Sequence, residues 1–223
     1  MQENIERQVR LAARALARGA LVHAYGHCSA RLDAERFIVC AAKPMGTIAA
    51  GEPGTVVPIN GPLPEGVLGE VRIHQAIYRR RPEIGAVCRI MAPQTMLLSV
   101  MRRTPKPRHG FGAYFAPCPP LWEDPRLLRD DAMAARLAEM MGDGKAIVMR
   151  ANGAVVAGVD LIEAVALAWF LEEAARVETG LIQCRADGDE TLLTPDEVTA
   201  RQVTAGRVYE RMWEYLTHGD AEA

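Results

Sequence analysis

Glu70 and His74 are the residues whose types and spacing first suggest chemistry in this sequence of 223 residues. They lie four positions apart in a segment that we expect to be helical, so both side chains project from one face of the helix. A carboxylate beside an imidazole is a usable acid–base pair, because each group changes the proton affinity of the other. Solvated surface contacts share this spacing, so the pair by itself leaves a catalytic and a surface interpretation open.

Arg89 and Asn152 are polar residues in apolar surroundings. Arg89 interrupts the apolar run 84–91. It forms either an ion pair with an acidic residue such as Glu70 or a clamp for an anion, since a guanidinium fits a carboxylate in a bidentate way. Asn152 precedes Gly153 and serves either the geometry of a tight turn or a ligand.

The composition excludes several classes of protein. The 26 basic and 28 acidic residues leave no excess positive charge for binding nucleic acid. The longest apolar runs are too short for a membrane span, and the polar N-terminus lacks the apolar stretch of a signal peptide, so we expect a cytoplasmic protein. A glycine-rich phosphate-binding loop is absent from the sequence, which argues against nucleotide-dependent chemistry. The five scattered cysteines predict reduced, mostly buried thiols.

Apolar periodicity and capping residues predict helices that alternate with short strands. A stretch rich in proline and arginine, 102–125, is expected to be an ordered functional loop whose basic residues are solvated or contact another subunit. We therefore expect one α/β domain over residues 1–223, a three-layer α/β/α sandwich around a mostly antiparallel or mixed sheet. The expected helices are 5–18, 65–81, 93–101, 129–141, 160–178 and a last one that opens at Thr194-Pro195, and the expected strands are 28–33, 36–42, 84–91, 145–150 and 154–158.

The order and spacing of several segments resemble the class II aldolase/adducin family, to which fuculose-phosphate aldolase belongs. The resemblance covers residues 18–178 and is carried by RGALVHAYGHCSAR, EVRIH, AIYRRRPEIGAV and MRANGAVVAG, with the long helix that follows. The segments LEEAARVE and TLLTPDEV are most similar to the decarboxylase-like branch that acts on hydroxylated aromatic acids. The family resemblance implies a nine-stranded sandwich and a homotetramer with active sites between subunits.

The sequence departs from the family pattern at the metal site. Family members bind zinc or manganese through a His-x-His pair at a strand end and a third histidine in a turn, and the matching residues here are Arg89, Met91 and Asn152. Arginine cannot ligate a metal, asparagine is a weak ligand and methionine a soft one, so we expect no metal and no other cofactor. Met91 is expected to pack in the core.

The phosphate-binding residues of the family are also changed. Its Gly-Asn-x-Ser turn is Gly26-His27-Cys28-Ser29 in this chain, and the Ser-Ser pair before the catalytic glutamate is Leu68-Gly69. The resemblance therefore implies a substrate other than a sugar phosphate.

The resemblance assigns Glu70 the role of catalytic acid and base and places His27 and Tyr114 near the substrate. We expect a metal-independent carbon–carbon lyase of decarboxylase or aldolase type, or a related proton-transfer isomerase. Its substrate would be a small carboxylated hydroxy or oxo compound or a hydroxylated aromatic compound. In this hypothesis His74 is the partner of Glu70 and Arg89 stabilises the anion that forms. The expected catalytic residues are Glu70, His74 and Arg89, and the expected substrate-binding residues are Asn152, His27 and Tyr114.

Two alternatives remain from the sequence. The first is a non-catalytic scaffold or binding module, like the adducin head, which resembles these enzymes yet lacks the metal ligands. The second is a conventional metalloenzyme that uses Glu70, His74 and another histidine as ligands. In the leading hypothesis the partners are a small carboxylate and further copies of the chain.

Overall fold

Seven strands form one sheet in the computed structural model, which describes residues 2–223, in the order β3-β2-β1-β4-β7-β6-β5. Neighbouring strands are antiparallel except β5 and β6, which are parallel. This confirms the expected mixed, mostly antiparallel sheet, with seven strands in the described residues where the family resemblance implied nine. The strands are β1 (His27–Arg31), β2 (Arg36–Val39), β3 (Thr55–Pro58), β4 (Ala86–Ile90), β5 (Leu121–Trp122), β6 (Ala146–Met149) and β7 (Ala154–Gly158).

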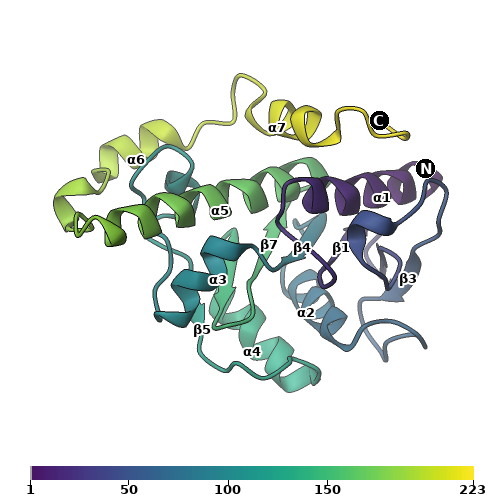
Figure 1. Ribbon diagram of the computed structural model, residues 1–223. Coiled ribbons are helices and arrows are strands. Elements are labelled where there is room, and N and C mark those ends of the chain that lie inside the picture. The colour runs from purple at the N-terminus through teal and green to yellow at the C-terminus, as the bar shows by residue number, and fades with distance from the viewer. Residues whose placement is uncertain (1) are drawn as a thin grey trace.

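Helices cover both faces of this sheet (Figure 1). Helices α1 and α5 pack against β1, β4 and β7, while α2 and α4 pack against each other on the opposite face, and α7 lies outside α1 and α5. The expected three-layer α/β/α architecture is therefore confirmed. The helices are α1 (Gln2–Arg18), α2 (Arg72–Arg80), α3 (Pro93–Val100), α4 (Asp131–Met141), α5 (Leu161–Gln183), α6 (Pro195–Arg201) and α7 (Val208–Thr217).

Capping residues set the starts of α5 and α6 as the sequence predicts. The Asp160 side chain accepts a hydrogen bond from the Glu163 backbone N–H at 2.8 Å, which satisfies one of the unpaired donors of the first turn. Thr194 and Glu197 form a reciprocal capping box at the start of α6. Helix α6 is not the last helix, because α7 follows it.

The segment 65–81 was expected to be one helix, and this is wrong in its first part. Residues Gly69–Val71 form a single 3₁₀ turn, and the α-helix begins only at Arg72. Pro64 and Gly66 precede the turn, and both residue types favour turns over helix interiors. Glu70 therefore lies on the tight turn before α2.

The segment 102–125 is ordered, and its basic residues contact their own chain. It contains a 3₁₀ turn at Gly112–Phe115 and the short strand β5. The Arg108 Nε donates to the Glu178 Oε2 of α5 at 2.5 Å, and both side chains are almost fully buried. Arg103, Lys106 and Arg108 form ion pairs within the chain, and the contact of this loop with another subunit stays a prediction.

The five cysteines are all free thiols, and three of them are buried. Cys28, Cys40 and Cys88 are free and buried, as expected, whereas Cys118 and Cys184 are free and exposed. Among residues 2–223, every helix is too short or too polar to cross a membrane.

Candidate functional site

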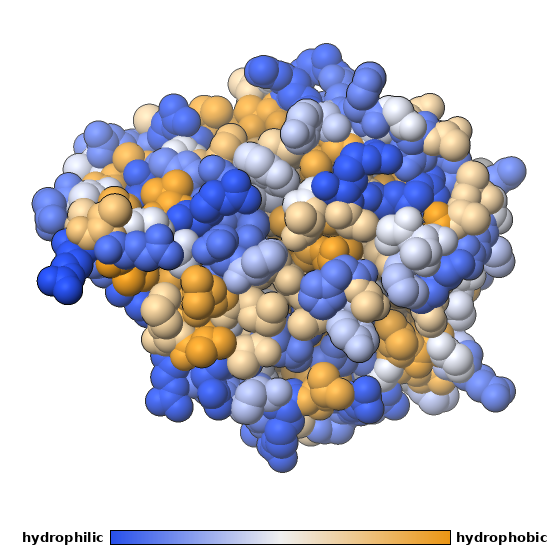
Figure 2. Space-filling view, viewed as in Figure 1, coloured by the Kyte–Doolittle hydropathy of each residue, from blue (hydrophilic) through white to orange (hydrophobic). Residues whose placement is uncertain are grey.

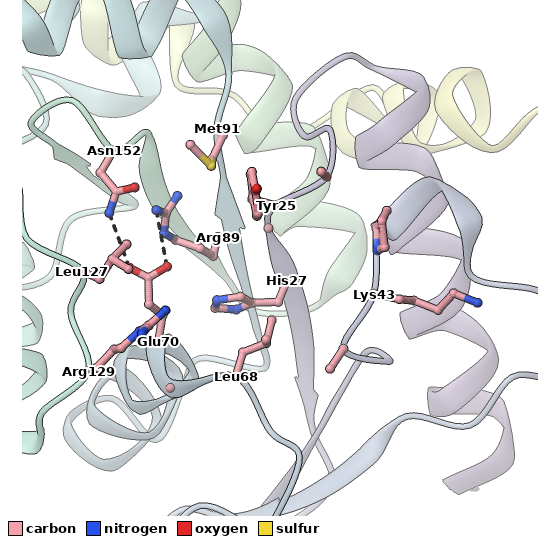
Figure 3. Close-up of a pocket in the computed structure, with 15 residues that line it drawn as sticks. Tyr25, His27, Lys43, Leu68, Glu70, Arg89, Met91, Leu127, Arg129 and Asn152 are labelled. Carbon is pink, nitrogen blue, oxygen red and sulfur yellow. Dashed lines mark hydrogen bonds and ion pairs between the residues drawn. The ribbon is translucent and has the colours of Figure 1, made fainter.

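A cavity of about 610 Å³ lies where the edges of four elements meet. The start of β1, the end of β4, the β6–β7 turn and the 3₁₀ turn before α2 each contribute to its wall. Leu68, Leu127 and Tyr25 form an apolar part of the lining (Figure 3). The polar and charged side chains that line it are His27, Lys43, Glu70, Arg89, Arg129 and Asn152.

The Glu70 carboxylate lies among three donors. Arg89 Nη2 is 3.6 Å from Glu70 Oε2, and both the Asn152 Nδ2 and the Leu128 backbone N–H are 3.4 Å from Glu70 Oε1 (Figure 3). These distances exceed the usual hydrogen-bond length, so none of the donors holds the carboxylate tightly. The Glu70 side chain also remains 17% exposed, which leaves it within reach of a ligand.

Arg89 is the buried cation of the cavity, with its side chain 2% exposed. Its Nη1 donates to the Ile90 carbonyl oxygen at 2.5 Å, while its Nε is buried without a partner. Burial lowers the pKa of Arg89 and the Glu70 carboxylate raises it, but a guanidinium stays protonated in proteins. The ion pair with Glu70, one of the two interpretations of Arg89, is therefore present, and the same side chain also faces the cavity.

The β6–β7 turn brings Asn152 to Glu70 because residue 153 is glycine. Gly153 has φ +75°, and a Cβ there would lie 2.1 Å from the Ile90 carbonyl oxygen of β4. The turn can pack this closely against the end of β4 only without a side chain. Asn152 thus serves the turn and also reaches the carboxylate.

His74 does not partner Glu70, and this expectation is wrong. His74 is fully buried, and its Nε2 lies 2.8 Å from His27 Nδ1 while its Nδ1 lies 2.6 Å from Ser29 Oγ. The reason is the 3₁₀ turn, because the spacing of four residues places side chains on one face only within a continuous α-helix. His74 packs behind His27, which lines the cavity.

Both imidazoles are held neutral by their surroundings. Burial lowers the pKa of His74 to about 3, with a further contribution from the positive charge of Arg89. Burial, His74 and Arg89 together hold the pKa of His27 well below its usual value. In a low dielectric the charged form of each ring is the costly one.

Tyr114 and Met91 lie elsewhere than expected, and the Lys43 side chain points out of the cavity. The Tyr114 hydroxyl donates to the Val203 carbonyl oxygen at 2.6 Å, and Tyr114 lies outside the cavity of its own chain. Met91 lines the cavity and is half-buried, so it is not a core residue. The Lys43 amine is directed away from the cavity, to Glu52 at 3.1 Å (Figure 3).

The residues present do not fit the divalent metal that the family resemblance implies. Of the matching positions, Arg89 places a fixed positive charge in the site, and Met91 and Asn152 offer soft or weak donors. Both ring nitrogens of His74 are engaged, so it is not available as a ligand. Across residues 2–223, no cluster of three or more His, Cys, Asp or Glu side chains has the arrangement of a metal site.

No role was predicted from the sequence for Arg129, nor for the hydroxyls of Ser29, which contacts His74, and of Tyr78, which contacts Ser29. Arg129 lines the cavity and packs over Gly69, where a Cβ would lie 3.1 Å from its Cγ, and no periodicity indicated this. Ser29 and Tyr78 had a usable signal. Ser29 lies two residues after His27 on a strand, and Tyr78 lies four residues after His74 on a helix, so each pair shares one face.

The mixed seven-stranded sheet between two layers of helices, with a charged cavity at its strand ends, makes this chain an α/β/α sandwich protein with a candidate site. The model of the Class II Aldolase and Adducin N-terminal domain matches residues 7–179. The chain therefore belongs to this family, as its sequence motifs predict. Comparison with curated proteins gave no match.

Solved structures with the same fold include aldolases from bacteria. The L-fuculose-1-phosphate aldolase of Thermus thermophilus has 22% identity and a TM-score of 0.74 over 83% of this chain and 98% of its own. An aldolase II superfamily protein of Pseudomonas syringae has 22% identity and a TM-score of 0.79 over 96% and 90%. YgbL of Klebsiella pneumoniae, a putative aldolase/epimerase/decarboxylase, has 22% identity and a TM-score of 0.75 over 91% and 99%.

Proposed function

We propose that this protein is a metal-independent carbon–carbon lyase, of decarboxylase or aldolase type, or a related proton-transfer isomerase. Its substrate is a small carboxylated hydroxy or oxo compound or a hydroxylated aromatic acid. The observation that carries the proposal is the loosely held Glu70 carboxylate beside the buried Arg89 guanidinium, 3.6 Å apart in one cavity. Such a pair supplies a group that moves a proton and a fixed charge that holds an anion.

Glu70 is the acid and base in this proposal, and Arg89 is the anion-stabilising group. When a β-keto acid loses carbon dioxide, the electron pair of the broken carbon–carbon bond passes to the neighbouring carbonyl, and an enolate forms. Arg89 stabilises the enolate oxygen, and Glu70 delivers the proton to carbon. An arginine polarises a carbonyl less than a metal ion does, so the substrate must itself provide the electron sink.

The charge and shape of the cavity favour a carboxylate with a small apolar or aromatic body. Arg89 and Arg129 bring two positive charges, Glu70 brings one negative charge, and Arg129 forms no ion pair among the described residues. Leu68 and Leu127 provide apolar surface beside these charges. The exposed Arg129 guanidinium at the mouth and the buried Arg89 guanidinium inside suit a ligand whose carboxylate and oxyanion lie at different ends.

The test is a panel of β-keto acids, 2-oxo acids, 2-hydroxy acids and hydroxybenzoates, followed by release of carbon dioxide and by exchange of substrate hydrogen for deuterium from solvent. Glu70→Gln should reduce any turnover by about 100-fold or more, the usual contribution of a general acid or base. Glu65→Gln is the matched control, because Glu65 is an exposed carboxylate on the same segment outside the cavity.

Two outcomes would contradict the proposal. Binding of carboxylates without turnover or exchange would support the non-catalytic alternative, a binding module like the adducin head. Loss of turnover with a chelator, restored by manganese or zinc, would show that the reaction depends on a metal.

A further inference from the structure

Four buried polar side chains form a continuous chain behind the cavity. Tyr78 OH lies 2.9 Å from Ser29 Oγ, Ser29 Oγ lies 2.6 Å from His74 Nδ1, and His74 Nε2 lies 2.8 Å from His27 Nδ1. All four residues are buried, and only His27 lines the cavity. The far ring nitrogen of His27, Nε2, is buried and has no partner in the described chain.

The direction in which each group of this hydrogen-bonded chain donates its proton follows from the two ends of the chain, the closed end at Tyr78 and the His27 end at the cavity. The Tyr78 hydroxyl proton has one acceptor within reach in the described residues, the Ser29 oxygen. If Ser29 accepts there, its own proton goes to His74 Nδ1, and the His74 proton on Nε2 goes to His27 Nδ1. Each direction leaves one donor without an acceptor in the described residues. The opposite direction leaves the Tyr78 proton at the closed end, whereas this direction leaves the His27 Nε2–H on the cavity side, where a ligand oxygen can accept it. His27 therefore carries its proton on Nε2.

We propose that this chain fixes His27 as a neutral hydrogen-bond donor, whose Nε2–H acts together with Arg89 Nε to hold an oxygen of the ligand. The direction of the hydrogen-bonded chain follows from its contacts and from the cavity at its His27 end, whereas the role toward a ligand rests on the proposed function. His27 and Arg89 are direct partners on the antiparallel strands β1 and β4. Both Nε atoms are buried donors without an acceptor in the described residues, so a ligand oxygen that reaches them would satisfy both.

Figure 3 shows the His27 imidazole directed toward the side of the cavity that holds Glu70 and Arg89. The ligand group at this place must be an acceptor, such as a carbonyl, enolate, phenolate or carboxylate oxygen, and an ammonium group is disfavoured. His27 itself keeps its proton, because losing it would leave a buried imidazolate anion. The proton that moves in the reaction thus belongs to Glu70, and His27 is a donor that stabilises the oxygen.

The experiment is nitrogen NMR of the full chain labelled with ¹⁵N-histidine. For His27 we expect one resonance of a protonated Nε2 and one of an unprotonated Nδ1, unchanged between pH 6 and pH 8. A protonated Nδ1 with a bare Nε2, or an imidazolium with both nitrogens protonated, would overturn the assigned direction.

Tyr78→Phe tests whether the closed end sets the direction. This variant keeps the ring but removes the hydroxyl that donates to Ser29. Ser29 then loses the hydrogen bond that polarises its own O–H toward His74, so the preference for one direction should weaken and the His27 nitrogen resonances should shift toward averaged values. Tyr215→Phe, at an exposed tyrosine on α7, is the control and should change nothing. Fixed His27 resonances in Tyr78→Phe would show that another group sets the tautomer.

Titration with pyruvate tests the role toward a ligand. The His27 Nε2–H proton should move downfield as the carboxylate or carbonyl oxygen accepts from it, and His27→Ala should weaken pyruvate binding by about tenfold. If the proton does not move at saturating or high pyruvate concentration, the donor role is wrong. If the proton moves but no compound of the panel is turned over, the donor role stands and the proposed lyase activity falls.

Discussion

At the scale of single residues, Arg89 carries a buried positive charge where the family pattern has a histidine, and its side chain faces both Glu70 and the cavity. If it stabilises the anion, Arg89→Ala should cost about 2–4 kcal/mol of transition-state stabilisation, the range of a lost oxyanion donor. Arg89→Lys should recover part of this, because an ammonium lacks the bidentate geometry. The measurement is kcat/KM on a compound that the panel shows to be turned over.

Arg89→Met separates charge from packing, since it fills space without charge. A thermal unfolding curve for each variant shows whether the activity change is a folding change. We expect a small loss of stability, because Glu70 is 17% exposed and water can replace part of its contact with Arg89. Full activity in Arg89→Ala would mean that the arginine is structural and that another group holds the anion.

The buried histidines predict a pH dependence of stability. Their pKa values are lowered in the folded protein, so between the folded value, about 3 for His74, and the unfolded value the unfolded state binds more protons. The contribution of these two histidines to the free energy of unfolding is therefore complete above about pH 6.5. It falls as the pH decreases below this value, by up to about 1.4 kcal/mol per pH unit for each histidine. Urea unfolding between pH 7.5 and pH 5 measures the slope.

His27→Asn should reduce this slope, because an amide forms hydrogen bonds without titrating. His109 also has a pKa lowered by burial and titrates in the same window, so His109→Gln serves as the background for the comparison. A stability that does not change from pH 7 to pH 5 would contradict the buried neutral pair.

At the scale of elements, a buried ion pair joins the segment 102–125 to α5, beside aromatic contacts of the same segment with Phe170. Arg108 and Glu178 have side chains 1% and 0% exposed, and Arg103 adds a second contact to Glu178 at 2.9 Å. Arg108→Leu should lower the free energy of unfolding by about 3 kcal/mol, because Glu178 then keeps a buried charge with a weaker partner. Denaturant unfolding measures the loss.

The double variant Arg108→Leu/Glu178→Leu should lose less than the sum of the single variants, because it removes both charges. Lys106→Ala is the surface control, since the Asp189 partner of Lys106 is 82% exposed and such pairs contribute little. Additive losses would mean that the two side chains act independently.

At the scale of the whole molecule, we propose a homo-oligomer, and a tetramer is the expected form. Exposed apolar side chains gather at the mouth of the cavity, where Tyr25 is 68%, Leu68 42% and Leu127 52% exposed. Other apolar patches lie among hydrophilic residues on the surface (Figure 2). Apolar surface of this kind marks contact sites.

Light scattering at micromolar concentration is expected to give a mass several times the 24.4 kDa of one chain. Leu127→Glu, which places a charge at the apolar mouth of the cavity, should shift the mass toward the monomer. Val159→Glu, at an exposed valine after the far end of β7, should not. A stable wild-type monomer would contradict the oligomer and leave the cavity formed by one chain alone.

The sequence alone predicts the family and most of the elements, five of the seven strands among them, but not β3, β5 or α7. Periodicity and capping residues predicted α5 from Asp160 and α6 from Thr194, because these signals are local and act within one turn. The apolar run that Arg89 interrupts and the turn at Asn152 were likewise visible without coordinates.

Only the tertiary structure decided which of these residues meet. The 3₁₀ turn at Gly69–Val71 separated Glu70 from His74, and the packing of α2 on β1 gave His74 a new partner in His27. The register of β1 against β4 placed His27 opposite Arg89. Such contacts join residues far apart in the chain, and their geometry depends on how whole elements pack, which residue spacing along one element does not specify.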